Sequence, residues 1–252
     1  MDSNRYTETN RDTIDRWVSD GWEWGKPVSH EEFLRAKEGN CSVLLTPNRP
    51  VPPEWLGDLK GKKVLCLASG GGQQGPLLTA AGAVCTVMDL SPKMLDAERL
   101  VAQREGYEIS VVEADMTQPL PFADASFDII FHPVSNVYIE DVHHVWRECF
   151  RVLKRGGILL SGLDNGINFA FNEEETELSF RLPFNPLKDP ELLKLSEENN
   201  WGIEFSHPIE DQIGGQLKAG FILTDVFEDT NSFGPLHDHN VPAFFATRSV
   251  KP

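Results

Sequence analysis

Short, almost wholly apolar runs alternate with helical patterns of apolar residues between positions 61 and 162. Each run has the length of a strand, and the near-absence of polar positions within it is typical of strands buried on both faces. The runs lie at residues 63–67, 84–88, 110–112, 127–131 and 158–161. Helical periodicity fills most of the gaps between them. Such repeated strand–helix units predict a doubly wound, Rossmann-like α/β sheet with mostly parallel strands.

Signals for helix ends support this division of the chain. Ser91 offers a side-chain cap, and Pro92 has a fixed φ that suits the first helical turn. Gly106 ends the same helix. An apolar stripe over residues 142–153 predicts another amphipathic helix ahead of the fifth strand.

The regular alternation stops after the fifth strand. Residues 163–205 carry an acidic run and several prolines, so we expect an insertion whose charges form a solvated face. A helix over residues 209–219 and strands over 221–227 and 243–249 are expected to follow. This ending is compatible with an antiparallel edge strand on the parallel sheet. We therefore assign residues 61–252 to one domain.

The first 60 residues are rich in tryptophan and proline. Ser29 and Glu32 form a capping box, and the prolines further along exclude a regular helix there. We predict that residues 1–60 form a helical lid segment. Its tryptophans either pack against the main domain or wall a substrate pocket, for which Trp22 and Trp24 are the candidates.

Charge and hydropathy narrow the class of protein. The 252 residues carry a formal net charge of −16, which argues against nucleic-acid binding because phosphates are bound mainly through Lys and Arg. No apolar run approaches the roughly 20 residues needed to span a bilayer. The polar N-terminus lacks the apolar core of a signal peptide, so a cytoplasmic location is expected by default. The sequence does not specify the oligomeric state.

The cysteines and histidines show no metal-binding pattern. Cys41, Cys66, Cys85 and Cys149 are irregularly spaced, and none forms a Cys-x-x-Cys pair. We predict reduced thiols and no metal site.

A glycine-rich turn follows the first strand directly. Ser69 precedes Gly70, Gly71 and Gly72, whose backbone can approach a ligand closely and adopt φ values denied to other residues. The next helix presents free amides to a polar or anionic group. Alone, such a turn also fits a nicotinamide or flavin protein. No Gly-Lys-Ser/Thr follows, which excludes a P-loop.

Acidic residues follow the next two strands. Asp89 ends the second strand and is suited to accept both hydroxyls of a ribose, although a dehydrogenase would share this feature. Asp115 follows the third strand and is suited to accept a hydrogen bond from an adenine amino group. The flexible apolar side chain of Met116 lies beside it.

The order of these features resembles class I S-adenosylmethionine-dependent methyltransferases. Phe127-Asp128 and the Leu153-Lys154-Arg155-Gly156-Gly157 turn complete the pattern, which covers about residues 61–162. The resemblance is greatest to the small-molecule group that includes ubiquinone- and menaquinone-pathway enzymes. The segment from Gly21 to Pro27 also looks like an uncharacterised bacterial subgroup of these enzymes.

The resemblance implies a set of cofactor contacts, which run from the methionine part through the ribose to the adenine. In that order they are Ser69 to Gly72 for the methionine part, His132 near the sulfonium, Asp89 for the ribose, Leu90 for the adenine face, and Asp115 with Met116 for the adenine edge. The family usually has an acid where Cys66 stands and a glycine where Ala68 stands. The first change removes a negative group near the amino group of the bound methionine, which backbone carbonyls can replace.

The segment after the fourth strand holds the candidates for the acceptor side. His132 titrates near neutral pH, so it can serve as a general base, orient the substrate or hydrogen-bond a neighbour structurally. Tyr138 is a second candidate for the same catalytic work, with packing as its alternative role. Asn136 lies between them and is a candidate for the substrate pocket.

We therefore predict a methyltransferase that transfers a methyl group from S-adenosylmethionine to a small molecule by direct displacement, releasing S-adenosylhomocysteine. A sulfonium is a good leaving group, so positioning and water exclusion matter more than strong acid–base chemistry. Two alternatives stay open. An NAD(P)-dependent oxidoreductase would share Asp89 and the glycine-rich turn but lacks a Tyr-x-x-x-Lys pair here. A non-catalytic protein could retain the fold and the cofactor.

Overall fold

Seven strands form one sheet in the order β3-β2-β1-β4-β5-β7-β6. The computed structural model describes residues 5–252. Strands β1 to β5 pair in parallel, and β7 runs antiparallel to both β5 and β6. The bounds are β1 (Lys63–Leu67), β2 (Val84–Asp89), β3 (Ser110–Glu113), β4 (Phe127–His132), β5 (Leu153–Asp164), β6 (Ile222–Asp229) and β7 (Phe244–Val250). The prediction of a mostly parallel, doubly wound sheet with an antiparallel edge is confirmed.

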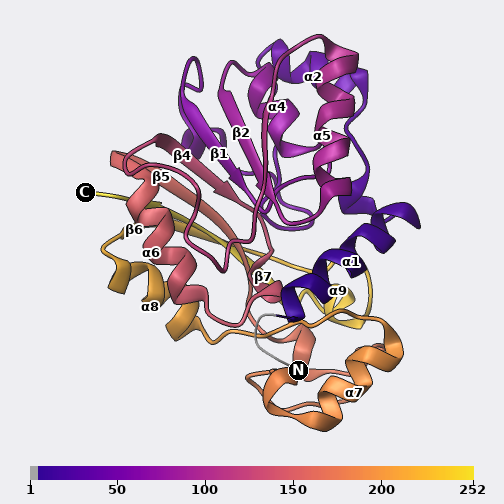
Figure 1. Cartoon of the computed structure of the whole chain (residues 1–252). Helices are drawn as coiled ribbons and strands as arrows, with labels where there is room; N and C mark the ends of the chain where they lie inside the picture. Colours follow the sequence, from indigo (N-terminus) through magenta and orange to yellow (C-terminus); the bar gives the residue numbers. More distant parts are fainter. Residues whose placement is uncertain (1–4) are drawn as a thin grey trace.

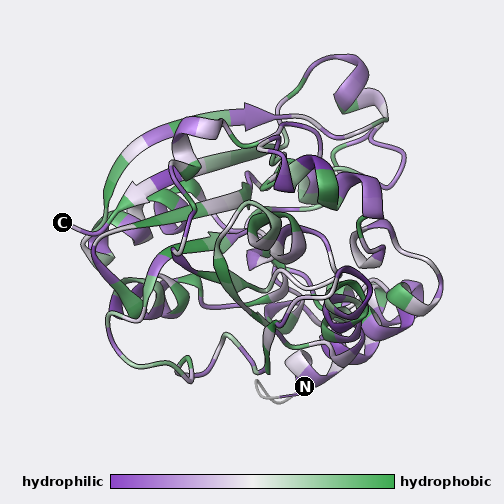
Figure 2. Ribbon diagram, turned by 90° about the horizontal axis from the view of Figure 1, so that it is seen from above, coloured by the Kyte–Doolittle hydropathy of each residue, from purple (hydrophilic) through white to green (hydrophobic). Residues whose placement is uncertain are grey.

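Helices cover both faces of this sheet (Figure 1). On one face α4 and α5 pack against β2 and α2 packs against α4, while on the other α6 packs against β5 and α8 against β6. Their bounds are α2 (His30–Lys37), α4 (Gln74–Ala80), α5 (Pro92–Glu105), α6 (Val142–Val152) and α8 (Ile209–Ala219). Hydrophobic residues gather on the central strands and on the inward faces of the helices (Figure 2).

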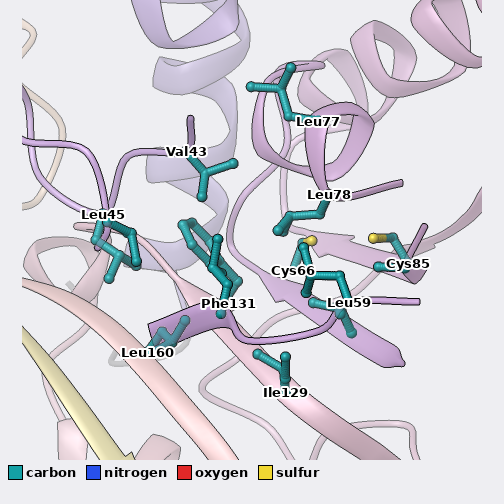
Figure 3. Packing of buried hydrophobic residues seen from close by; sticks show 14 of the residues in the cluster. Val43, Leu45, Leu59, Cys66, Leu77, Leu78, Cys85, Ile129, Phe131 and Leu160 are labelled. Carbon is teal, nitrogen blue, oxygen red and sulfur yellow. The ribbon is translucent and has the colours of Figure 1, made fainter. Parts of the chain in front are cut away.

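Alternate residues of each central strand enter two different cores. In β1, Cys66 belongs to the core beneath α4, whereas Leu65 belongs to the core beneath α6. Figure 3 shows the first of these cores, in which Leu78 of α4 and Phe131 of β4 meet around Cys66. Because both faces of the strands are covered, the strands read as continuous apolar runs.

Strand β5 is longer than the predicted strand at 158–161. At its start the backbone amide of Gly156 donates to the carbonyl of Lys251 (2.7 Å), and the amide of Lys251 donates to Gly157 (2.9 Å). At its end β5 stays paired with β7 as far as Asp164, opposite Phe244. The extension brings Asp164 to the edge of the sheet where the parallel strands end.

The N-terminal segment contains α1 (Tyr6–Ser19), η1 (Glu23–Gly25) and α3 (Pro53–Leu56) besides α2. The predicted capping box is present, because the Ser29 side chain accepts from the Glu32 amide and the Glu32 carboxylate accepts from the Ser29 amide. Leu45 is buried in the core beneath α4, and its carbonyl accepts from the amide of Val134 (3.2 Å). That carbonyl lies against Gly162 of β5, where a Cβ would not fit. Part of the segment therefore belongs to the main core.

Residues 165–208 lie between β5 and α8. They contain η3 (Asn168–Ala170), η4 (Pro186–Lys188) and α7 (Pro190–Asn199), while the remaining short helices are η2 (Asn136–Tyr138) and α9 (Pro235–Asp238). The Asn10 side chain of α1 joins three backbone groups: it donates to the carbonyls of Tyr138 (3.1 Å) and Ile203 (2.9 Å) and accepts from the Ile203 amide (2.7 Å). No helix within residues 5–252 is long and apolar enough to cross a membrane.

Candidate functional site

A cavity of about 870 Å³ lies at the carboxyl ends of the parallel strands. Residues that follow β1 to β4 line it, together with Asp164 at the end of β5. The N-terminal segment contributes Trp17 of α1 and Trp24 of η1, and the segment between β5 and α8 contributes Phe184 and Glu204. The cavity therefore extends across the sheet from β3 to β5 under cover from both segments.

Most of the predicted site residues meet in this cavity. The ones that line it are Trp22, Trp24, Ser69, Gly70, Asp89, Leu90, Asp115, Met116 and Tyr138. Among residues 5–252, the predicted ones outside the lining are Gly71, Gly72, His132 and Asn136. In the same part of the chain, no group of three or more His, Cys, Asp or Glu side chains is placed to hold a metal ion.

The glycine-rich turn contacts both the cavity and the N-terminal segment. The buried hydroxyl of Ser69 lines the cavity and has no hydrogen-bond partner within residues 5–252. Gly71 has a φ of +95° and lies against the carbonyl of Trp24, while the carbonyl of Gly72 accepts from the Val28 amide (2.9 Å). Two of the three glycines thus permit close approach of the N-terminal segment. Ala68, where the family has glycine, adopts the left-handed region with φ +47°.

Asp89 lines the half of the cavity that lies against the glycine-rich turn. Its Oδ2 accepts from the Gly70 amide (3.0 Å) and its Oδ1 from the Ser91 amide (2.9 Å). Burial raises the pKa of Asp89, and the two amides partly offset this. Each carboxylate oxygen has two lone pairs, so both oxygens keep capacity for one further donor. Asp115 is held similarly, with its Oδ1 accepting from the Thr117 amide (2.8 Å).

Glu98 of α5, which the sequence reasoning missed, contacts the glycine-rich turn from outside the cavity lining. Its side chain is fully buried, and its Oε1 accepts from the amide of Gly72 (2.7 Å). In the described part of the chain its Oε2 has no partner. Burial raises the pKa of Glu98 to about 8. The family usually has an acid at the position of Cys66. In this protein a carboxyl from a different element, α5, lies beneath the glycine-rich turn instead. Its position within the apolar stripe of α5 was the available signal.

His132 is fully buried at the end of β4. Its Nδ1 lies 3.0 Å from the carbonyl of Leu67, and its Nε2 lies 2.9 Å from the side-chain amide of Asn136. Asn136 also bonds to Gln212 of α8 (2.9 Å). Burial lowers the pKa of His132. Both ring nitrogens are therefore engaged inside the protein, in a chain of side chains that joins β1, β4 and α8.

The far half of the cavity is acidic and aromatic. Asp164 accepts from the Gly166 amide (2.5 Å) and from the Asn168 side chain (3.2 Å). Burial raises the pKa of Asp164 to about 7 and the pKa of Glu204 to about 8. Tyr138 lies between this half and Asp89, and burial raises its pKa well above the usual value.

Comparison with known proteins decides the family. The uncharacterized methyltransferase YbaJ of Bacillus subtilis (strain 168) is 45% identical over 255 residues, which cover 98% of this chain and 99% of that protein. The chain belongs to this methyltransferase family. A family model described as a methyltransferase domain also matches residues 65–161, the part that holds the glycine-rich turn, Asp89 and Asp115.

Solved structures of methyltransferases share the fold. An S-adenosylmethionine-dependent methyltransferase from Mesorhizobium loti is 18% identical with a TM-score of 0.62, over 78% of this chain and 94% of that one. The 1,6-didemethyltoxoflavin-N1-methyltransferase of Burkholderia thailandensis, solved with bound 1,6-didemethyltoxoflavin and S-adenosylhomocysteine, is 14% identical with a TM-score of 0.63, over 100% of this chain and 91% of that one. The predicted family, fold and enzyme class are confirmed, S-adenosylmethionine as cofactor is supported, and the oxidoreductase alternative is not favoured.

Proposed function

We propose that this methyltransferase transfers the methyl group of S-adenosylmethionine to a small organic acceptor, with donor and acceptor in the two halves of one cavity. The observation that carries the proposal is the continuity of the cavity from Asp89 and Asp115 to Asp164. S-adenosylmethionine supplies a methyl group on a sulfonium, which is a good leaving group. The protein therefore contributes mainly in-line positioning and the exclusion of water.

The residues of the cofactor half fit the expected donor. The free acceptor capacity of Asp89 suits two ribose hydroxyls. The unpaired, buried hydroxyl of Ser69 needs a polar partner, which the methionine part of the donor would provide. Leu90 and Met116 offer apolar surface beside Asp115, as an adenine ring requires.

The positions of His132 and Tyr138 support different roles. We assign His132 a positioning role, because its two nitrogens hold Leu67 and Asn136 and the ring does not reach the cavity. Tyr138 lines the cavity, and its raised pKa keeps the phenol protonated at neutral pH. It is therefore available as a hydrogen-bond donor to the acceptor.

The N-terminal segment acts as a lid in this proposal. The side chain of Gln73 donates to the carbonyls of Glu23 (2.8 Å) and Lys26 (3.0 Å), so the segment rests on the glycine-rich turn. Trp22 and Trp24 line the cavity from that segment. We expect S-adenosylhomocysteine to change the tryptophan fluorescence and Trp24→Phe to reduce this change. An unaltered response in Trp24→Phe would show that this ring lies outside the lid contact.

Calorimetry tests the proposed function directly. S-adenosylhomocysteine should bind and raise the melting temperature, whereas NADH should do neither. Asp89→Asn should weaken binding by about 1.5–3 kcal/mol, roughly 10- to 150-fold, because the ribose hydroxyls lose a charged acceptor. The matched control is Asp96→Asn, which changes an exposed carboxylate of α5 that pairs with Arg99.

Two results would overturn the proposal. One is a protein that binds NADH and ignores S-adenosylhomocysteine at millimolar concentration. The other is a folded Asp89→Asn variant with wild-type affinity, which would remove Asp89 from the ribose contact. Release of S-adenosylhomocysteine from S-adenosylmethionine in the presence of an acceptor then measures turnover.

A further inference from the structure

The charge of the cavity wall is one-sided. Among residues 5–252, none of the lining side chains is Lys, Arg or His. The lining contains seven acids, namely Asp89, Asp115, Asp164, Glu173, Glu174, Glu175 and Glu204. Asp89 and Asp115 belong to the cofactor half, which leaves five acids on the acceptor side. An acceptor with a carboxylate or phosphate would meet like charges here without a cation to offset them.

Within residues 5–252 two acids of this group have no partner, the exposed Glu174 and the half-buried Glu204, so Glu204 is the one shielded from solvent. Glu175 is occupied by Asn231 (2.7 Å) and the Leu236 amide (2.7 Å), and Glu173 accepts from Trp201 (2.9 Å). Within residues 5–252 no hydrogen bond or ion pair reaches the carboxyl of Glu204, whose burial and proximity to Asp164 disfavour its charged form. Two neighbouring carboxyls, Asp164 buried and Glu204 half-buried, are costly to ionise without a cation unless a ligand supplies the positive charge.

Backbone contacts hold Glu204 in this position. The side chain of Asn10 forms hydrogen bonds with both the amide and the carbonyl of Ile203, the neighbour of Glu204. The same side chain also donates to the carbonyl of Tyr138. Sheet order places the ends of β1 and β4 between Asp89 and Asp164. With neighbouring strands about 4.8 Å apart, the Asp164–Glu204 pair lies on the acceptor side and away from the ribose site.

A second observation points independently to a ligand in this half. Thr46 is 2% exposed and lines the cavity, and none of residues 5–252 supplies a partner for its Oγ1. The backbone contact of Leu45 with Val134 fixes Thr46 over the ends of β4 and β5. A buried hydroxyl without a partner needs a polar group from an occupant.

Aromatic rings form the rest of the acceptor half. Phe169, Phe180 and Phe184 line it, with ring centroids 5.3 Å apart for Phe169–Phe184 and 5.6 Å for Phe180–Phe184. Aromatic faces attract cations and pack against flat or apolar bodies. We infer that the acceptor is an amine with an aromatic or apolar body, whose ammonium group is paired by Glu204 and Asp164. This inference rests on the proposed function.

The chemistry of an amine acceptor balances with these groups. The ammonium loses one proton to the carboxylate of Glu204, which frees the nitrogen lone pair. That lone pair forms the new N–C bond to the methyl carbon, and the C–S bond breaks with its electrons staying on sulfur. The products are a methylated ammonium and S-adenosylhomocysteine. Glu204 then returns its proton to solvent.

Binding experiments on the protein saturated with S-adenosylhomocysteine test this assignment. The probes are phenethylamine, tryptamine and spermidine, with 2-phenylethanol, 3-phenylpropionate and indole-3-acetate as neutral and anionic counterparts. We expect the amines with aromatic bodies to bind at least about tenfold more tightly than their counterparts. Glu204→Gln should remove most of this preference, whereas Glu177→Gln, an exposed acid of the same segment outside the cavity lining, should not.

Proton release gives a readout that a structural role would not produce. The titratable groups that face Glu204 are Asp164 of β5 and Tyr138 of η2. At pH 7 a bound ammonium should ionise Glu204, so calorimetry in buffers of different ionisation enthalpy should show proton release. Glu204→Gln should remove most of this release and leave only the share from Asp164, whose pKa is raised to about 7. Tighter binding of the alcohols or acids, an unchanged amine affinity in Glu204→Gln, or no amine binding at all would overturn the inference. Failure to bind S-adenosylhomocysteine would overturn the proposed function instead.

Discussion

Replacing Gly71 by alanine is expected to lower the free energy of unfolding by about 3 kcal/mol or more. Two costs add at this position. The φ of +95° places an L-residue in the left-handed region, which costs about 1–2 kcal/mol. The new Cβ would also collide with the backbone carbonyl of Trp24 and approach Met94 Cε to 3.2 Å, and overpacking of this kind costs about 1–3 kcal/mol.

Gly39→Ala separates the two costs. Gly39 has a similar φ of +100°, but nothing lies within 4 Å of the position that an alanine Cβ would take there. We therefore expect the free energy of unfolding of this control to fall only by the cost of placing alanine in the left-handed region. For a chain of this size the additional loss in Gly71→Ala corresponds to a melting temperature lower by several degrees, at about 2–4 °C per kcal/mol. Equal melting temperatures for the two variants would show that the N-terminal segment does not press on the turn.

Gly71→Ala should also reduce the response to S-adenosylhomocysteine. The amide of Gly71 donates to the carbonyl of Met94 (2.9 Å), and the preceding amide of Gly70 donates to Asp89. A displaced Gly71 moves the turn that these bonds join to the ribose site. Binding in Gly39→Ala should remain at the wild-type level, because Gly39 lies outside the cavity lining.

The parallel part of the sheet was predictable because its signals are local. Each strand from β1 to β4 is an apolar run whose residues enter cores on both faces, as Leu65 and Cys66 do. Ser91 and Gly106 mark the ends of α5 by their own backbone preferences. The extra length of β5 was not predictable in this way. It depends on pairing with Lys251 and β7, whose residues are distant in sequence.

The two halves of the cavity also differ in whether local sequence signals determine them. Asp89 ends β2 and Asp115 lies two residues after β3, so their place at the edge of the sheet follows from the strand pattern. Glu204 belongs to a segment without regular structure, and its position depends on the contact of Ile203 with Asn10 of α1. No sequence pattern reports a contact between residues 193 positions apart. The half of the cavity that we propose for the acceptor therefore could be identified only from the structure.

Glu98 is an intermediate case and leads to the second large expected effect. It occupies the buried stripe of α5, where a charged residue is rare unless paired. Its Oε1 accepts from Gly72, and its neighbours include Cys85 and Asp89 but no cation among the groups that shift its pKa. The folded protein thus retains a proton on Glu98 that the unfolded chain has already released at neutral pH.

The sign of the resulting pH dependence follows from this difference. The pKa of Glu98 rises from 4.5 in the unfolded chain to about 8 in the fold. Below the lower value both states hold the proton, so the stability contribution is fully present. Between the two values the unfolded state binds fewer protons, and the free energy of unfolding falls by about 1.4 kcal/mol per pH unit. The stabilisation from Glu98 is lost as the pH rises through its pKa in the folded protein, about 8.

Glu98→Gln should remove this dependence while keeping the hydrogen bond from Gly72. We expect the variant to melt near the wild type at pH 5 and to gain about 3–5 °C over it with each pH unit up to about 8. Glu31→Gln on the exposed start of α2 is the control for removing one negative charge from an acidic protein. The raised pKa values of Asp164 and Glu204 also make the free energy of unfolding fall with rising pH. Both residues are present in the wild type and in the variant, so their effect cancels when the two are compared. A constant difference between Glu98→Gln and the wild type from pH 5 to 8 would mean that Glu98 is ionised beneath the turn.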